Sequence, residues 1–145
     1  QRKTMAYTII EVERKTGVAS RTLRFWADKG LFPFVQKDSN NVRYFSEKDV
    51  QWVFWIDCYR QIGMSIEDIK YYITLCAKGE NTAQERLEII QRQRQKTLDD
   101  IEKLQVVLEK LDYKVAYYKE MIAKQKDDIN PLNKEYVKCK KRVRF

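Results

Sequence analysis

The stretch from Val18 to Phe32, "VASRTLRFWADKGLF", places basic and aromatic side chains together on one short predicted helix. Leu23, Trp26 and Ala27 recur at positions i, i+3 and i+4, the spacing of a helical stripe that faces a core. A buried stripe on this side does not account for the residues on the other side. Those residues are Arg21, Arg24, Phe25 and Asp28.

The residues around this helix predict a winged helix-turn-helix. Thr8 and Glu11 have the spacing of a capping box, and the helix that they begin is expected to end at Gly17. The next helix starts near Ser20 and ends at Gly30, so a tight turn joins two short helices. The β-prone runs 34–37 and 42–45 flank an Asp-Ser-Asn-Asn turn, which predicts a hairpin, or wing.

Three further helices are expected after the wing. The first, 46–61, is apolar on more than one side and is therefore predicted to be buried between other elements. The second, 66–76, carries an isoleucine-rich face. The third, 82–126, contains no Pro or Gly and fits a heptad repeat, which predicts a coiled-coil helix about 65 Å long. Its predicted seam comprises Leu87, Ile90, Arg94, Thr97, Ile101, Leu104, Leu108, Leu111, Val115, Tyr118 and Ile122.

An apolar seam of this length needs a partner, and a parallel or antiparallel homodimer supplies one most simply. Asn130-Pro131 is expected to end the helix. The fold class is therefore mainly α, a winged helix-turn-helix head followed by a long coiled-coil dimerisation helix. The expected organisation is an N-terminal extension at 1–6, a DNA-binding domain at 7–76, a linker at 77–81, the dimerisation helix at 82–126 and a basic tail at 127–145.

Composition narrows the possible functions. Lys and Arg number 29 against 21 Asp and Glu, a net charge of +8 that favours a polyanionic partner. Histidine is absent and the three cysteines form no CxxC, so no metal, cofactor or enzymatic activity is expected. Neither a long apolar run nor a signal-like N-terminus occurs, so we expect a cytoplasmic protein without a membrane partner.

Double-stranded DNA is the polyanion that best suits this layout. Five basic residues are candidates to contact phosphates: Arg21, Arg24, Lys37, Arg43 and Arg60. Four residues at the start of the second helix could reach base edges or sugars: Ser20, Arg21, Thr22 and Phe25. Taken singly, each arginine could equally be a solvated surface charge.

The segment "YTIIEVERKTGVASRTLRFWADKGLF", followed by "VRYF" and "IGMSIEDIK", resembles the MerR family of transcriptional regulators from about Tyr7 to Ile122. The resemblance implies a homodimer on an inverted-repeat promoter whose spacer is too long. Distortion of that DNA would bring the promoter elements into register for RNA polymerase, an indirect effect. The family often has Ser or Thr where Ala19 stands, so the helix cap is expected from Ser20 or from a different start.

Carried over residue by residue, the recognition helix falls on 20–29, its phosphate contacts on Arg24 and Phe25, the wing arginine on Arg43 and a second wing on 60–69. The full set of residues expected at the DNA comprises Thr8, Ser20, Arg21, Thr22, Arg24, Phe25, Lys29, Lys37, Asn41, Arg43, Tyr44, Arg60, Met64 and Ser65.

The segment "CYRQIGMS", Cys58 to Ser65, is similar to the NmlR and AdhR branch of the family. This resemblance implies a response to carbonyl electrophiles or nitrosative stress through the Cys58 thiol. The alternative is that Cys58 packs beside Phe54 and that the inducer is unknown. Cys76 is expected in the core, and zinc shared by Cys58 and Cys76 is a weaker idea because two cysteines leave the coordination incomplete.

Two other classes of function compete with DNA binding. A thiol enzyme using Cys58 lacks a histidine base in this sequence. A coiled-coil scaffold whose head binds protein would fit the same helices. Salt-sensitive binding to duplex DNA separates the regulator from the scaffold, because phosphate neutralisation releases counterions and protein docking need not.

Overall fold

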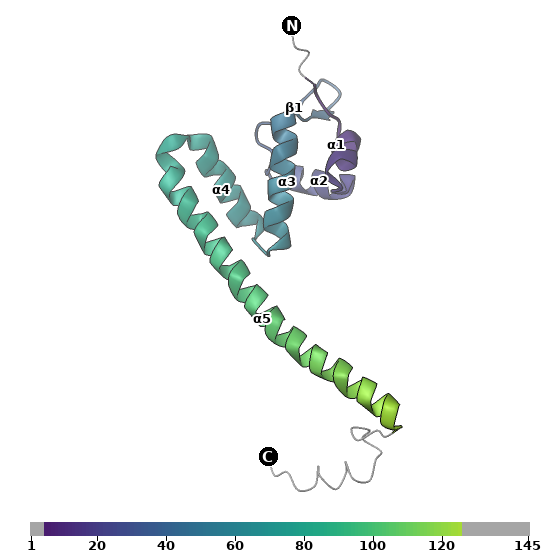
Figure 1. The fold of residues 1–145 in the computed structure, drawn as a ribbon. Coiled ribbons are helices and arrows are strands. Elements are labelled where there is room, and N and C mark those ends of the chain that lie inside the picture. The colour runs from purple at the N-terminus through teal and green to yellow at the C-terminus, as the bar shows by residue number, and fades with distance from the viewer. Residues whose placement is uncertain (1–4, 126–145) are drawn as a thin grey trace. The chain divides into compact units, whose positions relative to one another are not determined.

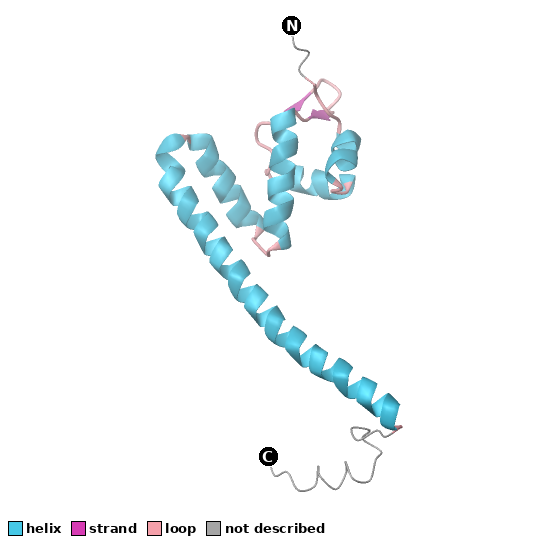
Figure 2. Ribbon diagram, in the orientation of Figure 1, coloured by secondary structure: helices cyan, strands magenta, loops and turns pink. Residues whose placement is uncertain are grey.

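The described residues form a series of helices interrupted by one short hairpin (Figures 1 and 2). This computed structural model describes residues 5–125. Two compact units divide after Thr97, and each is described by itself. The elements in order are α1 (Ile9–Thr16), α2 (Ser20–Asp28), β1 (Gln36–Lys37), β2 (Arg43–Tyr44), α3 (Glu47–Gln61), α4 (Ile66–Lys78), the 3₁₀ helix η1 (Glu80–Thr82) and α5 (Ala83–Lys124).

The predicted helix-turn-helix is confirmed. Thr8 and Glu11 form the capping box that begins α1. Gly17 ends it in the left-handed region at φ 75°, where a residue with a Cβ is strained, and its N–H donates to the carbonyl of Glu13. Leu23 and Trp26 of α2 are buried, as their spacing predicts.

The cap of α2 differs from the expectation. Ala19 is the N-cap residue and makes no side-chain hydrogen bond. The Ser20 hydroxyl does not cap the helix but donates to Oε2 of Glu13, at 2.6 Å. Hydrogen bonds from the Ser20 hydroxyl and backbone N–H lower the pKa of Glu13. A carboxylate from α1 therefore lies at the positive end of α2, where a negative charge is stabilising.

The hairpin forms as predicted but with shorter strands. Lys37 pairs with Arg43 in an antiparallel register. Oδ1 of Asp38 accepts N–H groups from Asn40 and Val42, both at 2.9 Å, and these hydrogen bonds help to lower its pKa. The turn is therefore held by one side chain, an Asx-type arrangement.

Helix α3 lies between α1 and α4, as predicted, but it is buried on one side and exposed on the other, so the expected burial around most of the helix was wrong. Its core side packs with α1, α2 and α4, and it carries Val50, Val53, Ile56 and Tyr59. Among the described residues no element covers its other side, where the side chains of Phe54, Trp55 and Cys58 are exposed. An apolar pattern all round a helix thus predicts two contact surfaces, and the described part of the chain covers one of them.

Helix α5 begins in the head unit and continues into the second unit. Ile89 is buried and Ile90 packs against the head core. At 1.5 Å per residue, its 42 residues span about 63 Å, close to the prediction. The apolar seam from Ile101 to Ile122 is exposed. The expected stop at Asn130-Pro131 and the tail at 127–145 lie outside the described residues.

No helix in the described part of the chain combines the length and the apolar character needed to cross a membrane.

The Ser20–Glu13 contact predicts a pH-dependent stability. The pKa of Glu13 is lower in the folded state than its ordinary 4.5. The contact therefore contributes fully to the free energy of unfolding above pH 4.5, and this contribution is lost as pH falls through the folded pKa. Ser20→Ala should therefore lower the melting temperature at pH 6.5, with a gap to wild type that narrows towards pH 3. Circular dichroism melts across this range measure the gap, with Ser39→Ala in the exposed turn as the control. A gap that is constant with pH would contradict this assignment.

Candidate nucleic-acid interface

The outward face of α2 carries both charged and aromatic side chains and is exposed. Leu23 and Trp26 anchor the opposite face, so Arg21 and Arg24 point away from the core. Phe25 remains 49% exposed, and the Lys29 Nζ lies 5.5 Å from the centroid of its ring. A cation above a ring face is attracted to it, which keeps positive charge beside the exposed ring.

Three segments far apart in the sequence meet beside this face. The N-terminus of α1, the middle of α2 and the turn and second strand of the hairpin surround a hollow of about 260 Å³. Four of the predicted DNA-contacting residues border it: Thr8, Arg24, Asn41 and Arg43. Its position brings the candidate recognition helix and the candidate wing into one surface.

An ion pair joins the wing to α2. Nη2 of Arg43 lies 3.2 Å from Oδ1 of Asp28, and the Arg43 side chain is only 19% exposed. Sequence reasoning placed Asp28 on the outward face of α2 but found no role for it. Its partner is 15 residues away in the sequence, and no local pattern indicated the pair.

The other candidate residues on the wing and on α2 differ in exposure and in the hydrogen bonds that they already make. Lys37 is exposed. The Tyr44 hydroxyl donates to Oδ2 of Asp38 at 3.2 Å, which raises the pKa of Tyr44. On α2, Thr22 is half-buried, and Ser20 already bonds to Glu13. The hydroxyls of Ser20 and Tyr44 would therefore have to exchange partners before donating to a ligand.

The predicted second wing is the turn between α3 and α4. Nη1 of Arg60 donates to the Met64 carbonyl at 2.8 Å, and Gly63 adopts φ 83° within the turn. Met64 is only 2% exposed, so its side chain belongs to the core and this residue can offer a ligand little more than backbone. The Ser65 hydroxyl caps α4 by accepting the N–H of Asp68.

The two described cysteines lie in different surroundings. Cys58 is exposed on α3, so the expected packing beside Phe54 does not bury it within a single chain. Cys76 is half-buried on α4, and Nη1 of Arg86 lies 4.0 Å from its sulfur. In the described residues no three potential ligands from His, Cys, Asp and Glu come together as a metal site.

Comparison with known proteins agrees with this geometry. The family described as MerR HTH family regulatory protein matches residues 7–75, and the one described as MerR, DNA binding matches residues 50–113. An HTH-type transcriptional regulator of Haemophilus influenzae is 36% identical over 114 residues, which cover 79% of this chain and 84% of that protein. The HTH-type transcriptional regulator AdhR of Bacillus subtilis is 33% identical over 91 residues, 63% of this chain and 65% of AdhR.

Solved structures give the same result. HiNmlR, a MerR family regulator lacking the sensor domain and bound to promoter DNA, matches with a TM-score of 0.75 and 35% identity, over 82% of this chain and 94% of that chain. A MerR family regulator from Bacillus thuringiensis matches with a TM-score of 0.73 and 31% identity, over 79% of this chain and all of that chain.

These relatives are transcriptional regulators and not enzymes, which removes the thiol-enzyme interpretation. A helix-turn-helix with a wing, an exposed arginine-bearing helix face and these matches together establish that the chain belongs to the MerR family of DNA-binding transcriptional regulators.

Proposed function

We propose that this protein is a homodimer that binds an inverted-repeat promoter and activates transcription by distorting an overlong spacer. The observation that carries the proposal is the hollow where α1, α2 and the wing bring Thr8, Arg24, Asn41 and Arg43 together. The matching HiNmlR structure is bound to promoter DNA, which supports the same partner class for this chain.

Contacts to the DNA backbone position the protein, and contacts from α2 read the sequence. Arg24 borders the hollow and Arg43 is held beside it by Asp28, so both suit phosphates. Phe25 offers an exposed ring to sugars or base edges. The remaining candidates, which would add backbone or groove contacts, are Ser20, Arg21, Thr22, Lys29, Lys37, Tyr44, Arg60, Met64 and Ser65.

The exposed seam of α5 supports a homodimer. Leu104, near its midpoint, is 67% exposed, and so long an apolar stripe is costly to leave in water. A parallel pairing would set Arg94 against a second Arg94. An antiparallel pairing centred on the seam instead separates the two Arg94 side chains, so we favour the antiparallel arrangement.

A two-fold dimer explains how transcription would be controlled. Two identical heads read an inverted repeat, and the dimer geometry sets the spacing of the half-sites. Bending and untwisting the spacer costs free energy that depends on its sequence, and the added protein contacts offset that cost. RNA polymerase then responds to the altered DNA, so it need not touch the regulator.

Cys58 is the proposed input. Its thiol is exposed on α3, the helix that runs from the wing to the second-wing turn. With an aldehyde, the thiolate sulfur bonds to the carbonyl carbon while the C=O pair moves to oxygen and takes a proton, giving a hemithioacetal. Because α3 connects the wing to the second-wing turn, a shift of α3 on modification would move both wings. The second candidate is the same regulator with an unmodified Cys58 and another inducer.

Arg24→Ala tests the DNA interface. If Arg24 contacts a phosphate, its removal should weaken binding about tenfold on operator and unrelated duplex alike. The slope of log K against log salt should become shallower by about 1. Fluorescence anisotropy at several salt concentrations measures both quantities, with Arg92→Ala on the exposed surface of α5 as control. Unchanged affinity and slope would show that the recognition helix is misplaced.

Replacing two seam residues tests the dimer. Leu104→Glu combined with Leu108→Glu places four carboxylates in one apolar interface and should halve the molar mass in solution. Light scattering after size exclusion reports this mass, and Lys103→Glu, which lies off the seam, should remain dimeric. A wild-type protein that is monomeric at micromolar concentration would refute the proposal.

Run-off transcription tests Cys58. The template carries an operator selected beforehand from DNA bound by this protein, and each protein is assayed with and without formaldehyde. Wild type and Cys76→Ser should respond, whereas Cys58→Ser should bind the operator without responding. If Cys58→Ser responds as wild type does, DNA binding stands and the thiol is not the sensor.

A further inference from the structure

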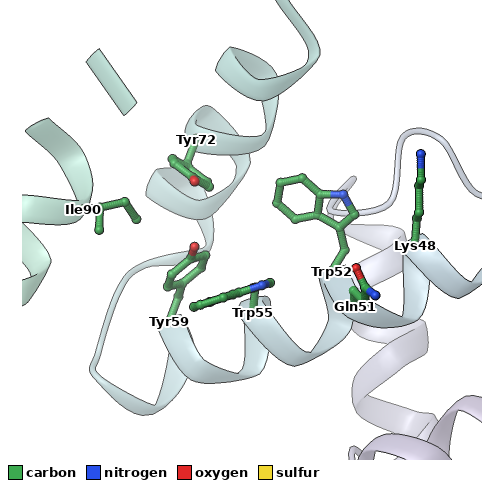
Figure 3. A pocket seen from close by; sticks show the side chains of 7 residues that line it. All are labelled: Lys48, Gln51, Trp52, Trp55, Tyr59, Tyr72 and Ile90. Atoms are coloured by element: carbon green, nitrogen blue, oxygen red, sulfur yellow. The ribbon is translucent and has the colours of Figure 1, made fainter. Parts of the chain in front are cut away.

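A cavity of about 500 Å³ opens between α3, α4 and the start of α5, within the head unit. Most of its wall is one face of α3, and Tyr72 of α4 and Ile90 of α5 complete it (Figure 3). Its volume lies within the range of small-molecule sites. The lining residues are Lys48, Gln51, Trp52, Trp55, Tyr59, Tyr72 and Ile90.

Contacts among the aromatic rings hold the cavity open. The Trp55 and Tyr59 rings stack with centroids 6.0 Å apart. Tyr72 meets Trp52 and Tyr59 edge to face, at 6.5 and 5.7 Å. Since each ring is restrained by another, the site is largely formed before any ligand arrives, which reduces the ordering cost of binding.

Trp55 provides a stacking surface. Trp55 is 57% exposed although one face of its ring stacks on Tyr59, so the other face is available. Tyr59 is buried, and this burial together with the neighbouring Tyr72 phenol raises its pKa well above the ordinary value of 10. Burial also raises the pKa of Tyr72, so both phenols are uncharged at neutral pH.

The charge of the lining is positive. Lys48 is the one formally charged residue that borders the cavity, and no carboxylate does. Across residues 5–125 the structure records no ion pair for its ammonium group. Gln51 lies one helical turn along the same face and carries two amide N–H donors.

We propose that this cavity binds a small planar aromatic carboxylate. The aromatic part stacks on the open face of Trp55, and the carboxylate accepts from Lys48 and Gln51. An aromatic enclosure also suits quaternary ammonium ions. Lys48 and the lack of a lining carboxylate disfavour a cation here.

Such a ligand would bridge three helices of the head unit. Neither Cys58 nor any residue that borders the hollow between α1, α2 and the wing is among the lining residues. Binding can therefore be measured without DNA, and a failure here leaves the proposed regulator intact.

The proposal is tested by titrating the full chain with 2-naphthoate and measuring the heat of binding by calorimetry. We expect saturable binding at one site per chain. Naphthoate should bind about tenfold more tightly than the neutral 2-naphthamide, because the amide cannot form the charge-assisted hydrogen bond that the carboxylate forms with Lys48. Lys48→Gln should abolish this preference, and Lys103→Gln, which removes the same charge elsewhere, should keep it.

The stacking contact is tested on the same helix. Trp55→Ala should weaken naphthoate binding at least about tenfold, and Trp55→Phe should retain part of the affinity, since it keeps a ring. Phe54→Ala is the matched control, because Phe54 is 50% exposed on α3 but does not line the cavity.

Two outcomes would overturn the proposal. The first is no saturable binding of naphthoate to wild type; if Trp55→Ala then also loses the dimer mass, a second copy covers these rings. The second is tighter binding of a naphthyl trimethylammonium ion, which would show a cation site.

Discussion

The burial of Leu23 and Trp26 orients the whole candidate interface. Once these two side chains enter the core beside α1 and α3, the geometry of a helix forces Arg24 and Phe25 outward. The wing then has to close against this face, and the Tyr7–Phe45 bridge and buried Phe45 hold its base there. The exposed arginines are thus a consequence of apolar packing on the opposite side of α2.

Polar contacts between elements refine this arrangement where local sequence does not. Ala19 leaves α2 without a side-chain cap, and Glu13 of α1 supplies a carboxylate at that position. Asp28 likewise restrains Arg43 across the gap between helix and wing. Both contacts align parts of the interface that would otherwise be joined only by loops, and a rigid surface loses less entropy on meeting DNA.

Within residues 5–125, two apolar surfaces are left uncovered, and they have different chemistry. The exposed seam of α5 is a long stripe of aliphatic and tyrosyl side chains, which suits a second helix. The face of α3 is instead concave, aromatic and bordered by Lys48 and Gln51, which suits a small ligand. A regulator built in this way would keep dimerisation, DNA binding and ligand binding on separate surfaces.

Local patterns in the sequence determined the helix starts at Thr8 and Ser46, the turn at Gly17, the hairpin and the long helix, because capping and periodicity depend on residues close in the chain. These local patterns also identified the family resemblance and predicted most of the residues on the candidate DNA-binding face. Tertiary structure decided which apolar surfaces are covered. Met64 is buried and Phe54, Trp55 and Cys58 are exposed because a hydrophobic pattern shows that a face is apolar but not whether another element reaches it. The Glu13–Ser20 and Asp28–Arg43 contacts and the cavity joining Trp52 to Ile90 likewise depend on residues brought together only by the packing of the helices.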